Sequence, residues 1–175
     1  LIQPGNYIYE QRRNYAQELK IEVEAFYTQL AGNTENIEFT YESRLEQSDF
    51  SNLLFEAEKK DLILQRSTVG VHKDDLKFEM QGQAFKSIAS QGQRKSLLFA
   101  LKLAEFQLLK KYKKFSPLLL MDDVFEKLDE ERMHQLLQWV CKENEGQVFI
   151  TDTHEERLQK ALKEVAIPFE IINLS

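Results

Sequence analysis

Cysteine is almost absent from this sequence. Cys141 is the single cysteine in 175 residues, which excludes an internal disulfide framework. Its scarcity fits a reducing cytosol, so we expect a cytoplasmic location. The sequence also lacks a signal-peptide pattern and any apolar run long enough to span a bilayer, and we expect no membrane association. It has no initiator methionine and begins Leu-Ile-Gln-Pro, which suggests a fragment.

Positive charge is also in short supply. The chain has 23 basic and 29 acidic residues, for a net charge of −6, which argues against a surface that is basic all round. A nucleic-acid partner would therefore have to be met by a local basic patch. With 42% apolar residues and 12 phenylalanines, the chain can build a real core and does not resemble a disordered protein.

The apolar pattern predicts a helical N-terminal part followed by alternating strands and helices. One narrow apolar stripe runs along residues 7–30, as in a two-helix arm. The predicted strands cover residues 37–41, 76–80, 118–121, 148–151 and 169–172. The predicted helices cover 7–30, 50–64, 91–112 and 130–141, and the capping-box form of 153–156 predicts one more. This alternation predicts a parallel sheet, with an arm over 1–66 and a head over 67–175.

Two adjacent carboxylates, Asp122 and Asp123, end an apolar run, and Asp129 follows six residues later. Burying like charges side by side is costly, and a metal ion would relieve that cost. Consecutive strand residues point to opposite sides, so one acid can hold Mg²⁺ while its neighbour faces a reacting water. The alternative is a helix-capping pair after a core strand, and the motif alone does not decide. Asp129 is equally an N-cap candidate for the helix over 130–141.

The stretch SQGQRKSLLFALKLAEF, which starts at Ser90, opens the long helix. Ser90 can cap this helix, and Gly92 lets a ligand approach the backbone. The N–H groups of the first turn and the helix dipole would then face an anion. The alternative is an ordinary capped helix.

Three ordered motifs together resemble an ABC-type ATPase head, and more narrowly the RecF family of bacterial recombination and gap-repair proteins. They are RSTVGVHKDD (66–75), ASQGQRKSLLFALKLAE (89–105) and LLLMDDVFEKLD (118–129). The resemblance implies an α/β fold: a partial P-loop (ABC-type) ATPase head with parallel strands and flanking helices, plus an N-terminal helical arm segment. No G-x-x-x-x-G-K-[ST] occurs. The chain therefore resembles the C-terminal half of such a protein, inactive as an ATPase alone.

The resemblance also implies roles for individual residues. The signature motif Ser90, Gln91, Gly92 and Gln93 would act in trans on the ATP of a partner head. Asp122 would help to hold Mg²⁺, Asp123 would polarise the attacking water, and Asp129, in the D-loop, would reach across the dimer interface. His72, Lys73 and Arg94 are candidates for the interface or the nucleotide. Val71, Lys73 and Gln91 depart from the family pattern, which usually has Pro, Arg and Gly there. Thr151-Asp152 stands at the switch-histidine position, and we do not assign that role to His154.

The implied partners are duplex and gapped DNA, a RecR-like protein and a second copy of the head, with ATP and Mg²⁺ as cofactors of the complete protein. The implied processes are DNA replication, recombination, repair and the SOS response. Candidate DNA contacts are Lys110, Lys111, Lys113 and Lys114, with Arg12 and Arg13 on the arm. The lysine run has an alternative that we favour, which is that it complements a helix C-terminus.

Two other functions stay open. One is another SMC-like ATPase head, which a longer heptad arm would favour. The other is a non-enzymatic module that offers a helical surface to a partner.

Overall fold

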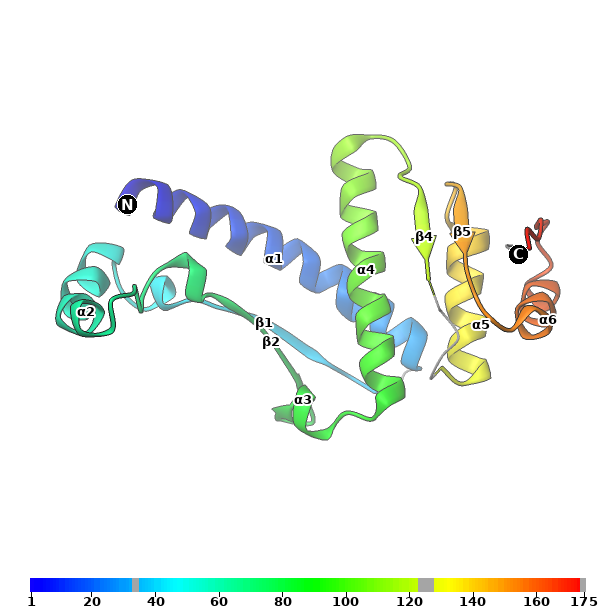
Figure 1. Cartoon of the computed structure of the whole chain (residues 1–175), viewed down its shortest axis with the longest axis horizontal. Coiled ribbons are helices and arrows are strands. Elements are labelled where there is room, and N and C mark those ends of the chain that lie inside the picture. The colour runs from blue at the N-terminus through cyan, green and yellow to red at the C-terminus, as the bar shows by residue number, and fades with distance from the viewer. Residues whose placement is uncertain (33–34, 123–127, 174–175) are drawn as a thin grey trace.

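The computed structural model describes residues 1–32, 35–122 and 128–173 (Figure 1). Its α-helices are α1 (Ile2–Ala31), α2 (Phe50–Leu64), α3 (Phe85–Ile88), α4 (Gln91–Lys113), α5 (Glu130–Gln138) and α6 (Glu155–Val165). Its strands are β1 (Glu38–Glu42), β2 (Asp75–Met80), β3 (Gln83–Ala84), β4 (Leu119–Met121) and β5 (Val148–Ile150). Two 3-10 turns, η1 (Arg44–Glu46) and η2 (Val71–Lys73), and a π turn, η3 (Trp139–Glu143), complete the described elements. Within the described ranges, no helix is both long and apolar enough to cross a membrane.

The core forms where α1 packs against α4 and α5. The apolar stripe of α1 is buried over Leu19, Val23, Phe26 and Leu30, at the helical spacing expected from the sequence. The facing side of α4 is lined by Ala100, Leu103 and Ala104, each at most 1% exposed. Small alanine side chains let the two helices approach closely, and the apolar stripe of α1 forms part of the main core.

Trp139 closes this core from the side of α5. Its ring meets that of Phe26 edge to face at a centroid distance of 4.8 Å, and that of Phe106 at 6.2 Å. Both distances lie in the favourable range for T-shaped aromatic pairs. The three rings therefore join α1, α4 and the turn that follows α5.

The strands form two small sheets instead of the single parallel sheet that the sequence predicts. β1, β2 and β3 are antiparallel, and only β4 and β5 run parallel. The connection from β1 to β2 includes α2, which lies beyond the end of these strands rather than over their face (Figure 1). The chain therefore leaves β1 and enters β2 at the same end, which makes the pair antiparallel.

Two local predictions in the C-terminal part are wrong. Residues 169–173 form no strand, and Figure 1 draws this segment next to α6, where it gains no strand partner. The capping box predicted at Thr153 is also absent, because α6 has His154 as its N-cap and no side-chain cap bond. The Asp152 carboxylate accepts the His154 N–H at 2.7 Å instead. The predicted division at 66/67 stays a prediction, although β1 pairs with β2 across it.

Candidate functional site

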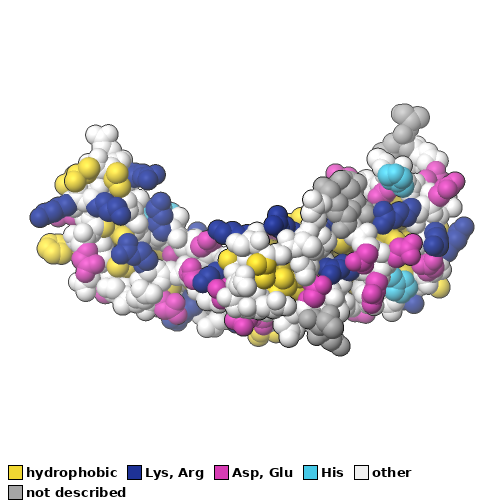
Figure 2. All heavy atoms as spheres, turned by 90° about the horizontal axis from the view of Figure 1, so that it is seen from below, with side chains coloured by type: hydrophobic (Ala, Val, Ile, Leu, Met, Phe, Trp, Pro, Cys, Tyr) yellow, Lys and Arg dark blue, Asp and Glu magenta, His cyan; other side chains and the backbone are white. Residues whose placement is uncertain are grey.

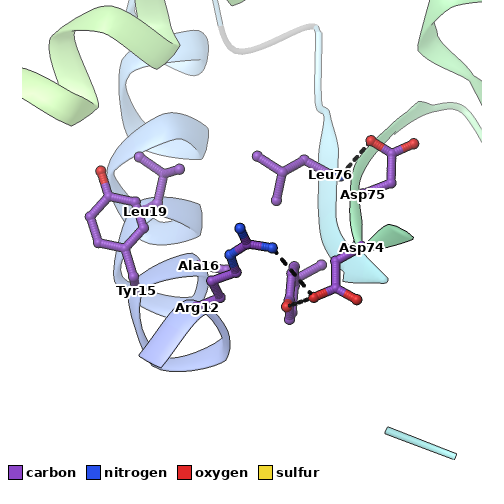
Figure 3. A pocket seen from close by; sticks show the side chains of 8 residues that line it. Arg12, Tyr15, Ala16, Leu19, Asp74, Asp75 and Leu76 are labelled. Atoms are coloured by element: carbon purple, nitrogen blue, oxygen red, sulfur yellow. Dashed lines mark hydrogen bonds and ion pairs between the residues drawn. The ribbon is translucent and has the colours of Figure 1, made fainter. Parts of the chain in front are cut away.

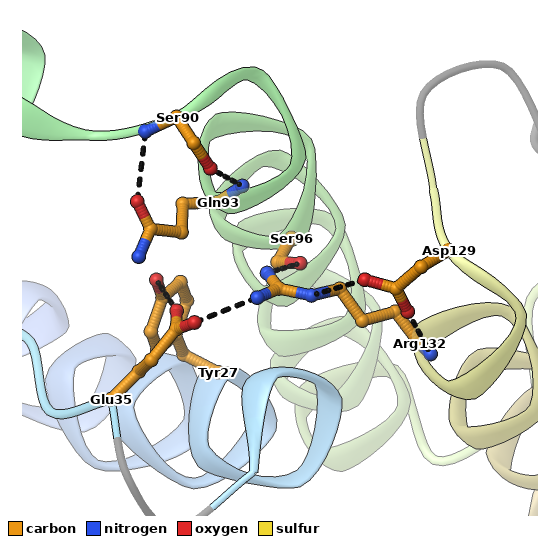
Figure 4. Close-up of polar contacts among 7 residues, drawn as sticks. All are labelled: Tyr27, Glu35, Ser90, Gln93, Ser96, Asp129 and Arg132. Carbon is orange, nitrogen blue, oxygen red and sulfur yellow. Dashed lines mark hydrogen bonds and ion pairs between the residues drawn. The ribbon is translucent and has the colours of Figure 1, made fainter.

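The N-terminus of α4 is closed by a capping box. The Ser90 Oγ accepts the N–H of Gln93 at 3.2 Å, and the Gln93 Oε1 accepts the N–H of Ser90 at 2.8 Å (Figure 4). The predicted N-cap role of Ser90 is therefore confirmed. Both bonds use an oxygen as acceptor, so neither consumes the hydrogen of the hydroxyl or those of the side-chain amide. This helix start therefore keeps donors for an anion, together with the N–H groups of Gln91 and Gly92 and the helix dipole.

The Asp122 carboxylate lies at the carboxyl end of β4, as the sequence predicts. The parallel register pairs Met121 with Ile150, which brings Asp122 beside Thr151 at the same sheet edge. Thr151 makes two hydrogen bonds at this edge. Its hydroxyl donates to Asp122 Oδ1, and its N–H donates to the Met121 carbonyl at 2.9 Å. Asp122 is exposed, so its carboxylate can reach a cation from solvent. The predicted catalytic acid, Asp123, lies outside the described residues.

A magnesium ion at Asp122 would need ligands from elsewhere. In the described part of the chain, no three His, Cys, Asp or Glu side chains gather to hold a metal. Mg²⁺ characteristically takes one or two carboxylates and completes its shell with water and substrate phosphates. The exposed Asp122 carboxylate is a ligand of the kind that Mg²⁺ takes in this way.

Asp129 is the N-cap of α5. Its Oδ1 accepts the N–H of Arg132 at 2.8 Å, which confirms the capping alternative from the sequence. Its Oδ2 lies 3.1 Å from Arg132 Nε. The side chain of Asp129 is still 61% exposed, so these two bonds orient a carboxylate that remains open to solvent.

Arg132 was missed by sequence reasoning, and it joins three segments (Figure 4). Besides Asp129, its Nη1 donates to Ser96 Oγ of α4 at 2.9 Å, and its Nη2 donates to Glu35 Oε1 at 2.7 Å. The other oxygen of Glu35 accepts the Tyr27 hydroxyl at 3.0 Å. Burial, and then this bond to Glu35, raise the pKa of Tyr27 above its usual value. No periodicity signals such a junction, because Arg132 and Glu35 stand 97 residues apart.

The three residues predicted to serve the interface or the nucleotide lie in two places. Arg94 lies near Ser90 and donates to the Lys86 carbonyl at 3.0 Å. His72 and Lys73 belong to η2, which precedes β2, whereas α4 follows it at the other end. His72 Nε2 lies 3.3 Å from the Ser67 carbonyl oxygen. Within one chain, therefore, the structure does not bring His72 and Lys73 to the α4 N-terminus.

The two aspartates of the first RecF-like motif, Asp74 and Asp75, line a cavity of about 270 Å³ between α1 and the β1–β2 pair (Figure 3). The Asp74 side chain is only 3% exposed, accepts the Tyr41 hydroxyl at 2.5 Å and lies 3.7 Å from Arg12 Nη1. Desolvation, and then the bond to Asp74, raise the pKa of Tyr41 above its usual value. Arg12 also donates to the Val71 carbonyl. Asp74 therefore ties η2 to α1 and β1 as a structural residue.

The basic candidates for DNA contact are partly engaged within the chain. Lys110 pairs with Glu145 at 3.1 Å and Lys111 with Glu18 at 2.6 Å. The lysine run occupies the last turn and C-cap of α4, where cations complement the helix dipole. On the arm, the Arg13 guanidinium lies 5.6 Å from the centroid of the Tyr9 ring. These contacts favour the structural alternative for Lys110 and Lys111.

Comparison with known proteins gives one consistent family. No protein-family model matches the chain. A curated "DNA replication and repair protein RecF" from Flavobacterium johnsoniae is 41% identical over 170 residues, which is 97% of this chain and 47% of that protein. The RecF of Bacteroides fragilis strain ATCC 25285 is 35% identical over 174 residues, or 99% of this chain and 47% of that protein. The chain thus spans about half the length of these curated relatives.

Solved structures agree. One described as "Structure of the recombination mediator protein RecF-ATPrS in RecFOR pathway" has a TM-score of 0.69 and 26% identity, and the match covers 87% of this chain and 43% of that one. A second, described as RecF-ATP, has a TM-score of 0.68 and 27% identity, over 87% and 42%. An SMC head bound to a domain of ScpA shares only the fold, with a TM-score of 0.51 and 11% identity over 81% of this chain and 36% of that one.

Proposed function

Because this chain is a homologue of RecF, matched over a segment of about half RecF's length, we propose that it is the C-terminal half of an ATP-dependent DNA-binding clamp. The homology supports a place in the RecF family of recombinational DNA repair proteins. The finer proposal is that two such heads dimerise around ATP during recombination and replication-gap repair. The observation that carries it is the capped N-terminus of α4 in a RecF homologue.

The α4 N-terminus has the chemistry that a γ-phosphate requires. The Ser90 hydroxyl, the Gln93 side-chain amide and the N–H groups of the first turn are all donors, and the dipole adds partial positive charge. We assign this surface to ATP held by the partner head, because the chain itself has no P-loop sequence. The N-terminus of α4 would then bind the partner head only when that head holds ATP.

Asp122 is the proposed ligand for Mg²⁺ that enters with ATP. When bound, the metal would neutralise charge on the phosphates. Thr151 supports this role, because its hydroxyl donates to one oxygen of this exposed carboxylate and so orients it. Asp123 stays the predicted residue that polarises water.

The proposed DNA contact is a local basic patch rather than the whole surface. Figure 2 shows Lys and Arg side chains gathered at the end of the molecule that carries α2. The exposed basic residues on α2 and just after it are Lys59, Lys60 and Arg66. Clustered cations of this kind bind the phosphate backbone without reading its sequence. A RecR-like protein stays a proposed partner of the complete clamp.

The test joins this chain to the remaining half of a RecF such as that of Flavobacterium johnsoniae. Light scattering then measures dimerisation with and without ATP–Mg²⁺ for wild type, Ser90→Arg and Ser90→Ala. Ser90→Ala removes the cap, at a cost of about 0.5–2 kcal/mol, but adds no bulk. Ser90→Arg also loses the cap and fills the space where the phosphate would lie. We expect ATP to drive dimerisation of wild type, with Ser90→Ala weakened and Ser90→Arg abolished.

A control applies the same change, Ser51→Arg, to the exposed first turn of α2, and it should dimerise like wild type. Equal behaviour of Ser90→Arg and wild type, or a wild type that ignores ATP, would remove the trans-capping role and leave Ser90 as a helix cap only.

A second candidate, a partner-binding module, is favoured by one observation. On α2, the side chains of Phe55, Leu62 and Ile63 are 81%, 73% and 82% exposed. Apolar side chains grouped in this way are typical of a protein-binding surface. This function would survive Ser90→Arg, so the same experiment separates the two.

A further inference from the structure

We propose that Arg132 is a positioning residue that locks the N-terminus of α5, with Asp129, against α4. The inference rests on the proposed function, because the α4 N-terminus and Asp129 are the two features assigned to the dimer interface. It goes further in naming the residue that makes them one rigid unit. Arg132 itself touches no nucleotide in this proposal and acts through Asp129 and Ser96.

The geometry of the guanidinium group carries the argument. Its Nε, Nη1 and Nη2 atoms each reach an acceptor on a different segment, at 3.1 Å for Asp129 Oδ2, 2.9 Å for Ser96 Oγ and 2.7 Å for Glu35 Oε1. Because the group is planar, three acceptors at fixed positions define its orientation completely. A lysine ammonium is a point charge on a flexible stem, so it cannot hold the same three acceptors in one plane.

Burial makes the junction costly to break. The Arg132 side chain is 14% exposed and that of Glu35 is 21% exposed, while Ser96 is only 1% exposed. Bonds between charged groups are stronger where water is scarce, and an unpaired charge there is unfavourable. Without Arg132, the carboxylates of Glu35 and Asp129 would lose their shared counter-charge.

The position of each partner explains what the junction does. Ser96 lies on α4 six residues after Ser90, within the first two turns of the helix that begins there. Asp129 is the cap of α5, and both of its oxygens are bound to Arg132, one to the side chain and one to the N–H. A shift of the α5 start must therefore pull on α4 through Arg132, and the reverse holds as well. Figure 4 shows the guanidinium group set between the two helices.

The first measurement is amide hydrogen exchange on this chain, which needs no nucleotide. The probes are the N–H of residue 132, bonded to Asp129 Oδ1, and that of Arg94, bonded to the Ser90 carbonyl at 3.0 Å. We expect Arg132→Lys to speed exchange at both helix starts by tenfold or more. The control Lys102→Ala, which removes an exposed cation paired with Glu105 on α4, should change neither. Unchanged exchange at the α4 start in Arg132→Lys would overturn the proposal.

The second measurement uses the joined RecF protein and compares two equilibria for wild type and Arg132→Lys. We expect ATP binding in the monomer to stay within twofold and ATP-driven dimerisation to weaken at least tenfold. A merely structural residue would lower both together, and unchanged dimerisation would also overturn the positioning role. Glu35→Gln, which keeps the shape of the side chain, serves as a second variant and should weaken dimerisation in the same direction.

The outcomes separate this inference from the proposed function. If wild type never dimerises with ATP, the proposed function fails, and the exchange result alone still decides whether Arg132 couples the two helix starts. If wild type dimerises with ATP but Arg132→Lys speeds hydrogen exchange only in α5, the proposed function stands. The proposed coupling between the starts of α4 and α5 is then wrong.

Discussion

Replacing Phe26 by alanine tests whether α1 belongs to the core of this protein. Phe26 is 6% exposed and its ring meets Trp139 edge to face at 4.8 Å. A buried Phe→Ala change typically costs about 3–5 kcal/mol, and the ring pair accounts for about 0.5–1.5 kcal/mol of interaction beyond its buried area. Domains of ordinary stability unfold with about 5–15 kcal/mol. We therefore expect Phe26→Ala to remove a large share of the free energy of unfolding.

The assay is urea unfolding followed by the fluorescence of Trp139, which is the single tryptophan in the sequence. Far-ultraviolet circular dichroism should report the same midpoint if unfolding is two-state. In a thermal scan the loss corresponds to a melting temperature lower by about 6–20 °C. Phe26→Leu, which keeps most of the apolar volume, should cost less than about 1.5 kcal/mol and provides a variant that still folds.

Phe55→Ala is the matched control, because the same atoms are removed from a side chain that is 81% exposed. We expect a change within about 0.5 kcal/mol. A cost below about 1 kcal/mol for Phe26→Ala would refute the reasoning. It would mean that α1 is not packed on α4 and α5, and it would favour an arm over 1–66 that folds apart from the head.

Two further predictions follow from single positions. A methyl group at Gly146 would lie 2.5 Å from Ser116 Oγ and 3.1 Å from the Pro117 carbonyl oxygen, so Gly146→Ala should cost about 1–3 kcal/mol in the same urea assay. An unfolding free energy equal to that of wild type would show that the loop before β5 can shift to make room for the methyl group, which would contradict this prediction. Burial raises the pKa of the Cys141 thiol from 9.0 to about 11, so at pH 8 the folded protein should react with a thiol reagent about a hundredfold more slowly than the urea-unfolded chain. Because the folded state binds the thiol proton more tightly, the protonated thiol contributes stability that is present below pH 9 and is lost as the pH rises toward 11. Equal labelling rates for the folded and the unfolded chain would contradict the burial of Cys141.

Local rules predicted the described α-helices except the short α3, and two of the helix caps. The stripe on α1 and the Ser90 and Asp129 caps depend on residues three or four positions apart, so the sequence displays them directly. The Thr153 cap failed although its pattern was equally good. Asp152, one residue earlier, binds the backbone N–H of His154, and the helix begins without a side-chain cap.

Features that depend on contacts between distant segments could not be predicted from the sequence in this way. The antiparallel pairing of β1 with β2 depends on where α2 packs, and alternation of strands and helices carries no information on that. Thr151 meets Asp122 only because β4 and β5 pair in one register. Arg132 resembles any polar residue in the first turn of a helix until Ser96 and Glu35 are placed around it.

The separation of Arg132 from Glu35 by 97 residues also has a consequence for how the chain is made. A ribosome adds about 5–20 residues per second, so roughly 5–20 s pass between the synthesis of these two residues. Helix α1 is already synthesised when this interval begins, whereas α4 is made within it and α5 starts only at its end. Within this segment, the apolar stripe of α1 is therefore made before the helices that cover it. Chaperones that hold apolar helices should matter most in this window.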